Sequence, residues 1–165
     1  MLWIGDFMKS FNYRSDLSLE EKVLMGVIRA AESFKRVFSS IFKQYDLSFP
    51  QYNILRVLEA STDGQSRITE VSRIMLVPGA NMTGLARRLE KGGFIFRNSD
   101  AKDERVTLLQ ITSKGKTTLK KIENDRDQAL KKMLKGLSKA EQQILVDQIK
   151  KLIHNSRRIA GDDRF

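Results

Sequence analysis

The stretch that decides the fold covers residues 67–112 and reads RITEVSRIMLVPGANMTGLARRLEKGGFIFRNSDAKDERVTLLQIT. Apolar residues recur in it at three- and four-residue steps, first over 67–75 and then over 79–91, which predicts two short helices. Only Leu76-Val77-Pro78 lies between them, and proline cannot continue a helix. Two short helices across a tight turn predict a helix-turn-helix unit.

The spacing also predicts which side of each helix is buried. In the first helix we expect Ile68, Val71 and Ile74 to face the core. In the second helix four apolar residues share one side: Met82, Leu85, Ala86 and Leu89.

A β-hairpin is predicted directly after the helix pair. Lys91-Gly92-Gly93 ends the second helix, and residues 94–98 and 106–111 have the composition of strands. The segment 99–105 between them is polar and charged. We therefore expect a hairpin whose loop is somewhat longer than the tightest types.

Long helices are predicted on both sides of this region. Ser18 and Glu21 form a capping box before an amphipathic helix over about 18–45. A second helix begins after Ser48, has Pro50 in its first turn, and ends at Thr62-Asp63-Gly64.

The C-terminal part of the chain predicts two more helices. Thr112 caps one that runs to about Lys135. Ser138 and Glu141 form another capping box, which opens a final helix to about Arg158.

The fold class that follows is mainly α with a small β-hairpin. The chain is expected to be one domain, 1–165, with a winged helix-turn-helix region over 48–111. The helices 18–45 and 112–158 offer more apolar surface than one small head can cover, so we expect them to dimerise. Residues 1–17 carry no recognisable role.

Charge indicates the class of partner. The net charge is +10, and residues 1–66 contribute nothing to it. Nine basic and five acidic side chains lie in 67–114, and twelve and five lie in 115–159. A basic protein of this size favours nucleic acid first and an anionic membrane second.

Several function classes are excluded or disfavoured. The chain has no cysteine, which rules out disulfides and thiolate metal or redox sites. No apolar run approaches the roughly 18 residues of a spanning helix, and we expect a cytoplasmic protein. Carboxylates are scattered and His154 has no partner residues, so we expect no enzyme, no catalytic or metal site and no cofactor.

A short helix pair followed by a charged hairpin can touch duplex DNA in two places. The second helix of the pair fits the major groove. The hairpin tip, with Lys102 and Arg105, can reach the neighbouring minor groove or its phosphates.

Three segments resemble the MarR (multiple antibiotic resistance regulator) family. Residues 46–55, DLSFPQYNIL, are similar to the start of its second helix, and residues 88–97, RLEKGGFIFR, to its recognition-helix exit and first wing strand. Residues 100–105, DAKDER, followed by Leu109, Ile111-Thr112 and Gly115, resemble its wing signature.

The resemblance covers about residues 18–158 and implies an obligate homodimer that presents two winged heads to a palindromic operator. It also implies repression that a small, often aromatic or phenolic, effector relieves. Asp103 and Arg105 stand at the family's paired acid and arginine positions, Asp103 as a structural residue of the wing and Arg105 at the DNA. Because the chain lacks cysteine, the peroxide-sensing branch is excluded.

Two departures from the family pattern shift the expected base contacts. Gly84 stands where a basic residue is usual, and Pro78-Gly79 opens the recognition helix. Base reading must then fall on Asn81, Thr83 and Arg87. Because neighbouring residues point about 100° apart, one of Arg87 and Arg88 is expected at phosphate and the other in an ion pair. The DNA-binding residues expected are thus Asn81, Thr83, Arg87, Arg88, Lys102 and Arg105.

Two alternatives stay open. Phe38, Phe42 and Tyr52 either line a ligand pocket or are plain core residues. The chain could also be a protein-interaction or membrane-surface module that uses its basic C-terminal helices. Such a module would bind in a way that is insensitive to the wing and unselective among DNA sequences.

Overall fold

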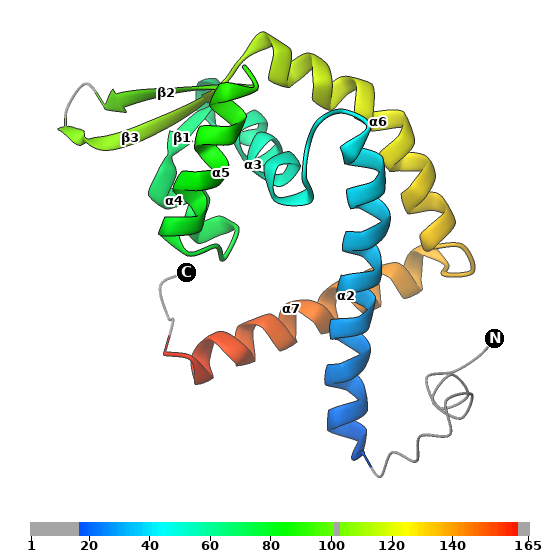
Figure 1. Cartoon of the computed structure of the whole chain (residues 1–165). Coiled ribbons are helices and arrows are strands. Elements are labelled where there is room, and N and C mark those ends of the chain that lie inside the picture. The colour runs from blue at the N-terminus through cyan, green and yellow to red at the C-terminus, as the bar shows by residue number, and fades with distance from the viewer. Residues whose placement is uncertain (1–16, 101–102, 162–165) are drawn as a thin grey trace. The chain divides into compact units, whose positions relative to one another are not determined.

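A computed structural model describes residues 17–100 and 103–161 of the 165-residue chain. The chain divides into two compact units, Met1–Arg126 and Asp127–Phe165. The elements in chain order are α2 (Leu19–Lys43), α3 (Phe49–Ala60), a 3-10 turn η1 (Thr62–Gly64), β1 (Gln65–Arg67), α4 (Ile68–Ile74), α5 (Gly79–Lys91), β2 (Ile95–Asp100), β3 (Asp103–Ile111), α6 (Ser113–Met133) and α7 (Lys139–Ile159) (Figure 1).

Three helices begin where a serine caps them. In each, the serine hydroxyl accepts the backbone N–H three residues on, and that residue's side chain accepts the serine N–H in return: Ser18 with Glu21, Ser48 with Gln51, and Ser138 with Glu141. The two predicted capping boxes are confirmed, and the one at Ser48 is additional. The Ser138 hydroxyl and backbone N–H bond the Glu141 carboxylate and hold its pKa below the ordinary value.

The helix-turn-helix is confirmed, with α4 and α5 within one residue of the predicted bounds. Ser72 fixes the turn between them, because its hydroxyl donates to the Val77 carbonyl at 2.5 Å and its carbonyl accepts the Val77 N–H at 3.1 Å. Leu76 has a φ of 52°, in the left-handed region that leucine rarely adopts.

The predicted burial of α4 is wrong at Ile74, which is 54% exposed. Val71 is fully buried and Ile68 partly so. Successive three-residue steps fall short of a full turn, so Ile74 has rotated away from the core. Met75, four residues after Val71, packs against the core in its place.

The sheet has three antiparallel strands in the order β1-β3-β2. The hairpin of β2 and β3, hereafter the wing, projects from the helices beside α5 (Figure 1). The strand β1 was not predicted. It has only three residues, all polar, and backbone pairing of Gln65 with Gln110 and Arg67 with Leu108 holds it in the sheet.

The predicted loop over 99–105 is also wrong. Ser99 and Asp100 belong to β2, residues 103–105 belong to β3, and Asp100 pairs with Asp103. Outside the core both faces of a projecting ribbon meet solvent, so its strands need no apolar alternation and carry no such signal in the sequence.

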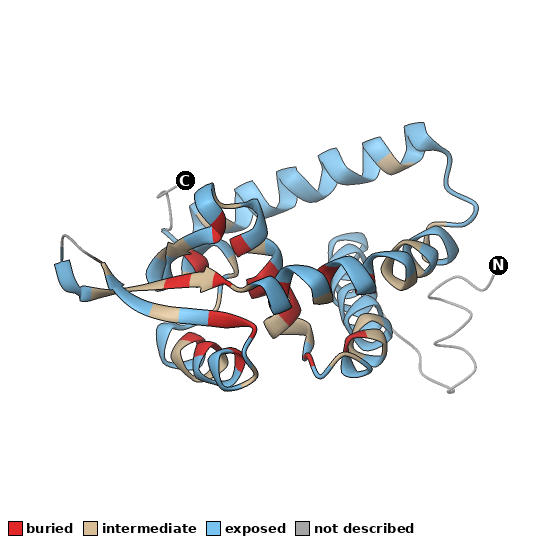
Figure 2. Cartoon of the chain, turned by 90° about the horizontal axis from the view of Figure 1, so that it is seen from above, coloured by how far each residue is buried: buried red, intermediate tan, exposed pale blue. Residues whose placement is uncertain are grey.

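The core of the first unit lies beneath α3, α4, α5 and the base of the wing (Figure 2). We call residues 48–111 the head. Its fully buried side chains include Ile54, Leu55, Leu58, Val71, Met82, Ala86, Leu89 and Leu109. Leu119 and Ile122 of α6 complete this core.

The start of α6 is locked onto the wing. The Thr112 hydroxyl donates to the Gly93 carbonyl at 2.8 Å and accepts the Gly115 N–H at 3.0 Å, so Thr112 caps α6 as predicted. A Cβ on Gly115 would lie 2.5 Å from the Phe94 carbonyl oxygen and 2.7 Å from Ile111 Cγ1. Only glycine permits this close approach of the helix to the strand.

The helix α7 differs from the head in having no buried residue. Its large apolar side chains are exposed: Ile144, Leu145, Val146, Ile149, Leu152, Ile153 and Ile159. Across residues 17–100 and 103–161, no helix combines the length and apolar character needed to cross a membrane.

Candidate nucleic-acid interface

The helix α5 has one buried and one outer side. Met82, Ala86 and Leu89 are completely buried, and contacts with α3, α4 and β2 hold the helix in place. The residues opposite them, which we call the outer face, are Ala80, Gly84, Arg87 and Lys91.

Small side chains occupy the N-terminal half of the outer face. A Cβ on Gly79 would meet nothing within 4 Å, and one on Gly84 would meet only the Arg88 guanidinium at 3.9 Å. The glycine at 84 is therefore not required by packing. Without bulky side chains, the helix backbone can approach a groove closely, while Arg87 and Lys91 bring positive charge at the other end.

The two residues predicted to read bases lie on different flanks of this face. Asn81 is exposed and shares its flank with Arg88, since seven residues amount to almost two full turns. Thr83 is half-buried and lies on the other flank with Arg87. The Thr83 hydroxyl donates to the Gly79 carbonyl at 3.1 Å, which leaves it only acceptor capacity.

The arginines of α5 are available for an anionic partner. Arg87 and Arg88 are both exposed, and among the described residues no carboxylate pairs with either guanidinium. The ion pair that we expected for one of them is not formed with any carboxylate of residues 17–100 and 103–161. Both charges remain solvated, as phosphate-binding side chains are before they meet DNA.

In the wing, Arg105 is likewise exposed. Its backbone N–H donates to the Asp103 carboxylate at 3.0 Å, which is a local turn interaction that shapes the strand. The Arg105 guanidinium itself makes no ion pair with any residue that the structure describes. Lys102 lies outside the described residues.

Two ion pairs fix the wing to its neighbours. Arg97 of β2 pairs with Glu90 of α5 at 3.3 Å, and Arg67 of β1 pairs with Asp100 of β2 at 3.2 Å. Both are partly exposed, so their main effect is geometric. The Arg97–Glu90 pair ties the wing to α5 and the Arg67–Asp100 pair ties it to β1, and two contacts on one rigid ligand require such fixed spacing.

Phe38, Phe42 and Tyr52 form an aromatic cluster. The ring centroids of Phe42 and Tyr52 are 3.8 Å apart and those of Phe38 and Phe42 are 5.7 Å apart. Phe42 and Tyr52 are buried and belong to the core. The stacked rings fill the space between them, and their role as a ligand pocket stays a prediction.

Polar groups border this cluster. Arg126 Nη1 donates to the Tyr52 hydroxyl at 3.4 Å, and the Tyr45 hydroxyl donates to Asp125 at 2.9 Å. That hydrogen bond to the carboxylate is the main cause that raises the pKa of Tyr45.

Reasoning from the sequence missed Lys91 and the tethering pairs. Lys91 was assigned only to the helix end, although its four-residue spacing from Arg87 could have placed it on the outer face. The partners Glu90 and Arg97 are seven residues apart across a turn, and Arg67 and Asp100 are thirty-three apart. Only the folded chain shows such pairs.

Comparison with known proteins agrees with this geometry. The family model described as transcriptional regulator SarA/Rot matches residues 36–122, more than half of the chain. The HTH-type transcriptional regulator TtmR of Methylorubrum extorquens is 32% identical over 99 residues, which are 60% of this chain. The chain spans 50% of the length of TtmR. The HTH-type transcriptional regulator YkoM of Bacillus subtilis is 29% identical over 143 residues, 82% of this chain and 91% of YkoM.

Solved structures share the fold. A MarR family transcriptional regulator from Streptomyces coelicolor, determined in complex with DNA, superposes with a TM-score of 0.76 over 87% of this chain and 91% of its own. Its sequence identity to this chain is 21%, so the likeness is one of fold.

Proposed function

The chain is a MarR-family transcriptional regulator of the SarA/Rot type with a DNA-binding winged helix-turn-helix fold, and we propose that it acts in the cytoplasm as a ligand-responsive repressor. In this proposal a homodimer binds a two-fold-symmetric duplex site. Its relatives are transcriptional regulators and not enzymes.

One observation carries the proposed DNA contact. The outer face of α5 joins small residues, Ala80 and Gly84, to unpaired positive charge at Arg87, beside a wing that ion pairs hold in place. In this account α5 enters the major groove, Asn81 and Arg87 contact base edges, and Thr83 accepts from a base or a water. Arg88 and Lys91 bind phosphates, and Arg105 with Lys102 reaches the minor groove.

The proposed dimer uses apolar side chains that the chain itself does not cover. Ile144 is 60% exposed on α7, and Leu24 is 59% and Val27 41% exposed on α2. Water-exposed apolar area on this scale favours an interface between subunits. We assign dimerisation to the helices 18–45 and 112–158, and the head 48–111 to DNA, within one functional domain.

The effector part of the proposal rests on the aromatic cluster. The rings of Phe38, Phe42 and Tyr52 stack on one another, and the Tyr52 hydroxyl at one end of the stack accepts a hydrogen bond from Arg126. In this proposal an aromatic or phenolic effector replaces one ring in the stack. The polar group of the effector accepts a hydrogen bond from Arg126.

The test is to identify the DNA that the protein selects. Genomic fragments bound by the purified protein are recovered and sequenced, and the enriched sequence is aligned. We expect an inverted repeat with half-site centres about one helical turn apart, as a symmetric dimer requires. Fragments with no common sequence would contradict the proposal and would favour a module that uses its basic helices without selecting a site.

A further inference from the structure

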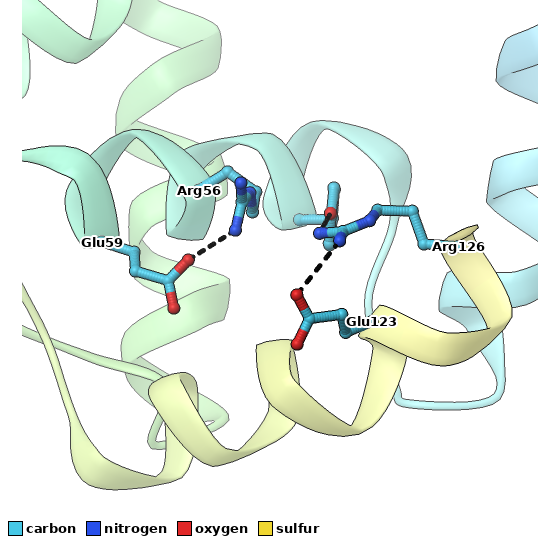
Figure 3. A network of polar contacts seen from close by, with 5 residues as sticks. Arg56, Glu59, Glu123 and Arg126 are labelled. Atoms are coloured by element: carbon cyan, nitrogen blue, oxygen red, sulfur yellow. Dashed lines mark hydrogen bonds and ion pairs between the residues drawn. The ribbon is translucent and has the colours of Figure 1, made fainter. Parts of the chain in front are cut away.

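A hollow of about 350 Å³ opens between α3 and the first half of α6. Its walls come from Arg56 and Glu59 of α3 and from five residues of α6: Lys116, Thr117, Leu119, Lys120 and Glu123. Figure 3 shows Arg56 and Glu59 on one helix facing Glu123 and Arg126 on the other. The volume is at the small end of ligand pockets, so an occupant must be small.

The carboxylates of the hollow are already occupied by arginines. Arg56 Nη1 lies 2.6 Å from Glu59 Oε2, and Arg126 Nη2 lies 3.4 Å from Glu123 Oε1 (Figure 3). Each of these pairs joins residues three apart on its own helix. Neither carboxylate pairs with a lysine of the hollow.

The two lysines of the hollow are therefore left without a carboxylate partner among the described residues. Lys116 and Lys120 are one helical turn apart, and among the described residues no carboxylate lies within ion-pairing distance of either ammonium group. Like charges at this spacing destabilise a helix. An anion placed between them removes that repulsion and gains two charge-assisted hydrogen bonds.

The remaining lining adds a donor and an apolar floor. Thr117 contributes a hydroxyl that can donate to an anion, and Leu119 is 3% exposed at the base. The methylene stems of Lys116 and Lys120 extend this apolar surface. A ligand that fits has a compact group with several acceptor oxygens and a short apolar part.

We propose that this hollow between α3 and α6 binds a small phosphomonoester, with Lys116, Lys120 and Thr117 around the phosphate and Leu119 beneath the organic part. The hollow shares no lining residue with the outer face of α5 or with the aromatic cluster, although Arg126 contacts both Glu123 and Tyr52, and it does not depend on the proposed DNA contact. Duplex DNA fits less well, because a hollow of about 350 Å³ admits one compact group and not a continuous phosphate backbone.

Isothermal titration of the full-length protein with phenyl phosphate, without DNA and at constant ionic strength, tests the proposal. We expect saturable binding by the wild type and about tenfold or more weaker binding by the double variant Lys116→Gln/Lys120→Gln. The control, Lys131→Gln/Lys135→Gln, removes the same charge from the C-terminal end of α6 and the turn that follows it, and should bind within about twofold of wild type. Circular dichroism confirms that each variant is folded.

A variant that should strengthen phenyl phosphate binding sharpens the test. Glu123→Gln removes a negative charge beside the phosphate and should tighten binding about two- to threefold. Absence of saturable binding by the wild type, or equal losses in the two double variants, would overturn the proposal. It would also be overturned if Lys116→Gln/Lys120→Gln weakened duplex DNA binding alone, since the lysines would then serve the DNA backbone.

Discussion

The head and α7 differ in how much of their apolar surface is buried. In the head, side chains such as Ile54, Met82 and Leu89 are fully buried, and the charged residues face outward. In α7 no residue is buried, and Ile144 remains 60% exposed. The head thus has a buried core, which Leu119 and Ile122 of α6 complete, whereas the apolar side chains of α7 are exposed. Most helices need tertiary packing of an apolar face. We infer that the head carries recognition and that α7 requires a second copy of the chain.

The largest effect is expected on α7. Ile149→Asp places a charge in the proposed interface twice per dimer, which costs about 3–6 kcal/mol if each isoleucine is buried there. The dimer dissociation constant should then rise at least about a hundredfold, measured by sedimentation equilibrium. Gln148→Asp is the control on the neighbouring, polar position. A variant that stays as dimeric as the control would remove α7 from the interface.

At the border of the head, the junction of the wing and α6 leaves no room for a side chain at Gly115. Gly115→Ala puts a methyl group against the Phe94 carbonyl and Ile111, and overpacking of this kind costs about 1–3 kcal/mol. The midpoint of urea unfolding should fall. Gly84→Ala is the matched control, because it meets only a flexible arginine and should stabilise α5 by about 1 kcal/mol or less. Equal stabilities of the two variants would show that the junction is loose.

If the head reads a DNA sequence, replacing Asn81 should weaken binding to the specific site more than binding to other DNA. Its amide can donate and accept together, as adenine requires in the major groove. Asn81→Ala should cost about 1–3 kcal/mol on the recovered site and much less on a scrambled duplex, measured by fluorescence anisotropy at one salt concentration. Equal losses on both duplexes would make Asn81 a positioning residue and leave base reading to Thr83 and Arg87.

If the wing contacts DNA, replacing Arg105 should change how DNA affinity depends on salt concentration. Because the Arg105 guanidinium has no ion pair among the described residues, Arg105→Ala should leave stability unchanged and weaken binding to every duplex. The slope of log affinity against log salt should become shallower by about two per dimer, one phosphate contact for each wing. Glu104→Ala removes a neighbouring charge of opposite sign and serves as the control. An unchanged slope for Arg105→Ala would mean that the wing does not touch DNA.

The smallest effect concerns the turn of the helix-turn-helix. Leu76 is 65% exposed and has a φ of 52°, so its side chain buries little while its backbone is strained. Leu76→Gly should stabilise the head by about 1 kcal/mol, seen as a rise in the melting temperature. Ile74→Gly, at a helical position, should destabilise it. If Leu76→Gly also destabilised the head, an unrecognised packing role for the leucine would be indicated.

The contrast between the two regions also explains what the sequence could predict. Helix starts at Ser18 and Ser138 depend on local chemistry, as do the stop at Gly92-Gly93 and the break at Pro78, and all of them were predicted from the chain alone. The strand β1 and the length of the wing depend on backbone pairing with distant residues, and they were missed. Ile74 was misplaced because spacing alone does not tell whether it or Met75 completes the buried side of a short helix.

The site shows the same division. The residues expected at DNA could be named because their segments resemble motifs of the MarR family. The structure shows Arg87 and Arg88 exposed on α5 and Arg105 exposed on the wing. The spacing between these elements depends on the pairs Arg97–Glu90 and Arg67–Asp100, which join segments that the sequence does not link. The flanks on which Asn81 and Thr83 lie follow from the buried side of α5, which the spacing of Met82, Ala86 and Leu89 predicts.

The central claim, that the head reads a DNA sequence, is tested most directly by one comparison. The affinity of the wild-type protein is measured by fluorescence anisotropy for the duplex recovered from the genome and for a scrambled duplex of the same composition, at one salt concentration. Specific regulators bind their sites at least about a thousandfold more tightly than other DNA, and we predict a ratio in that range. Equal affinities for the two duplexes would contradict the claim.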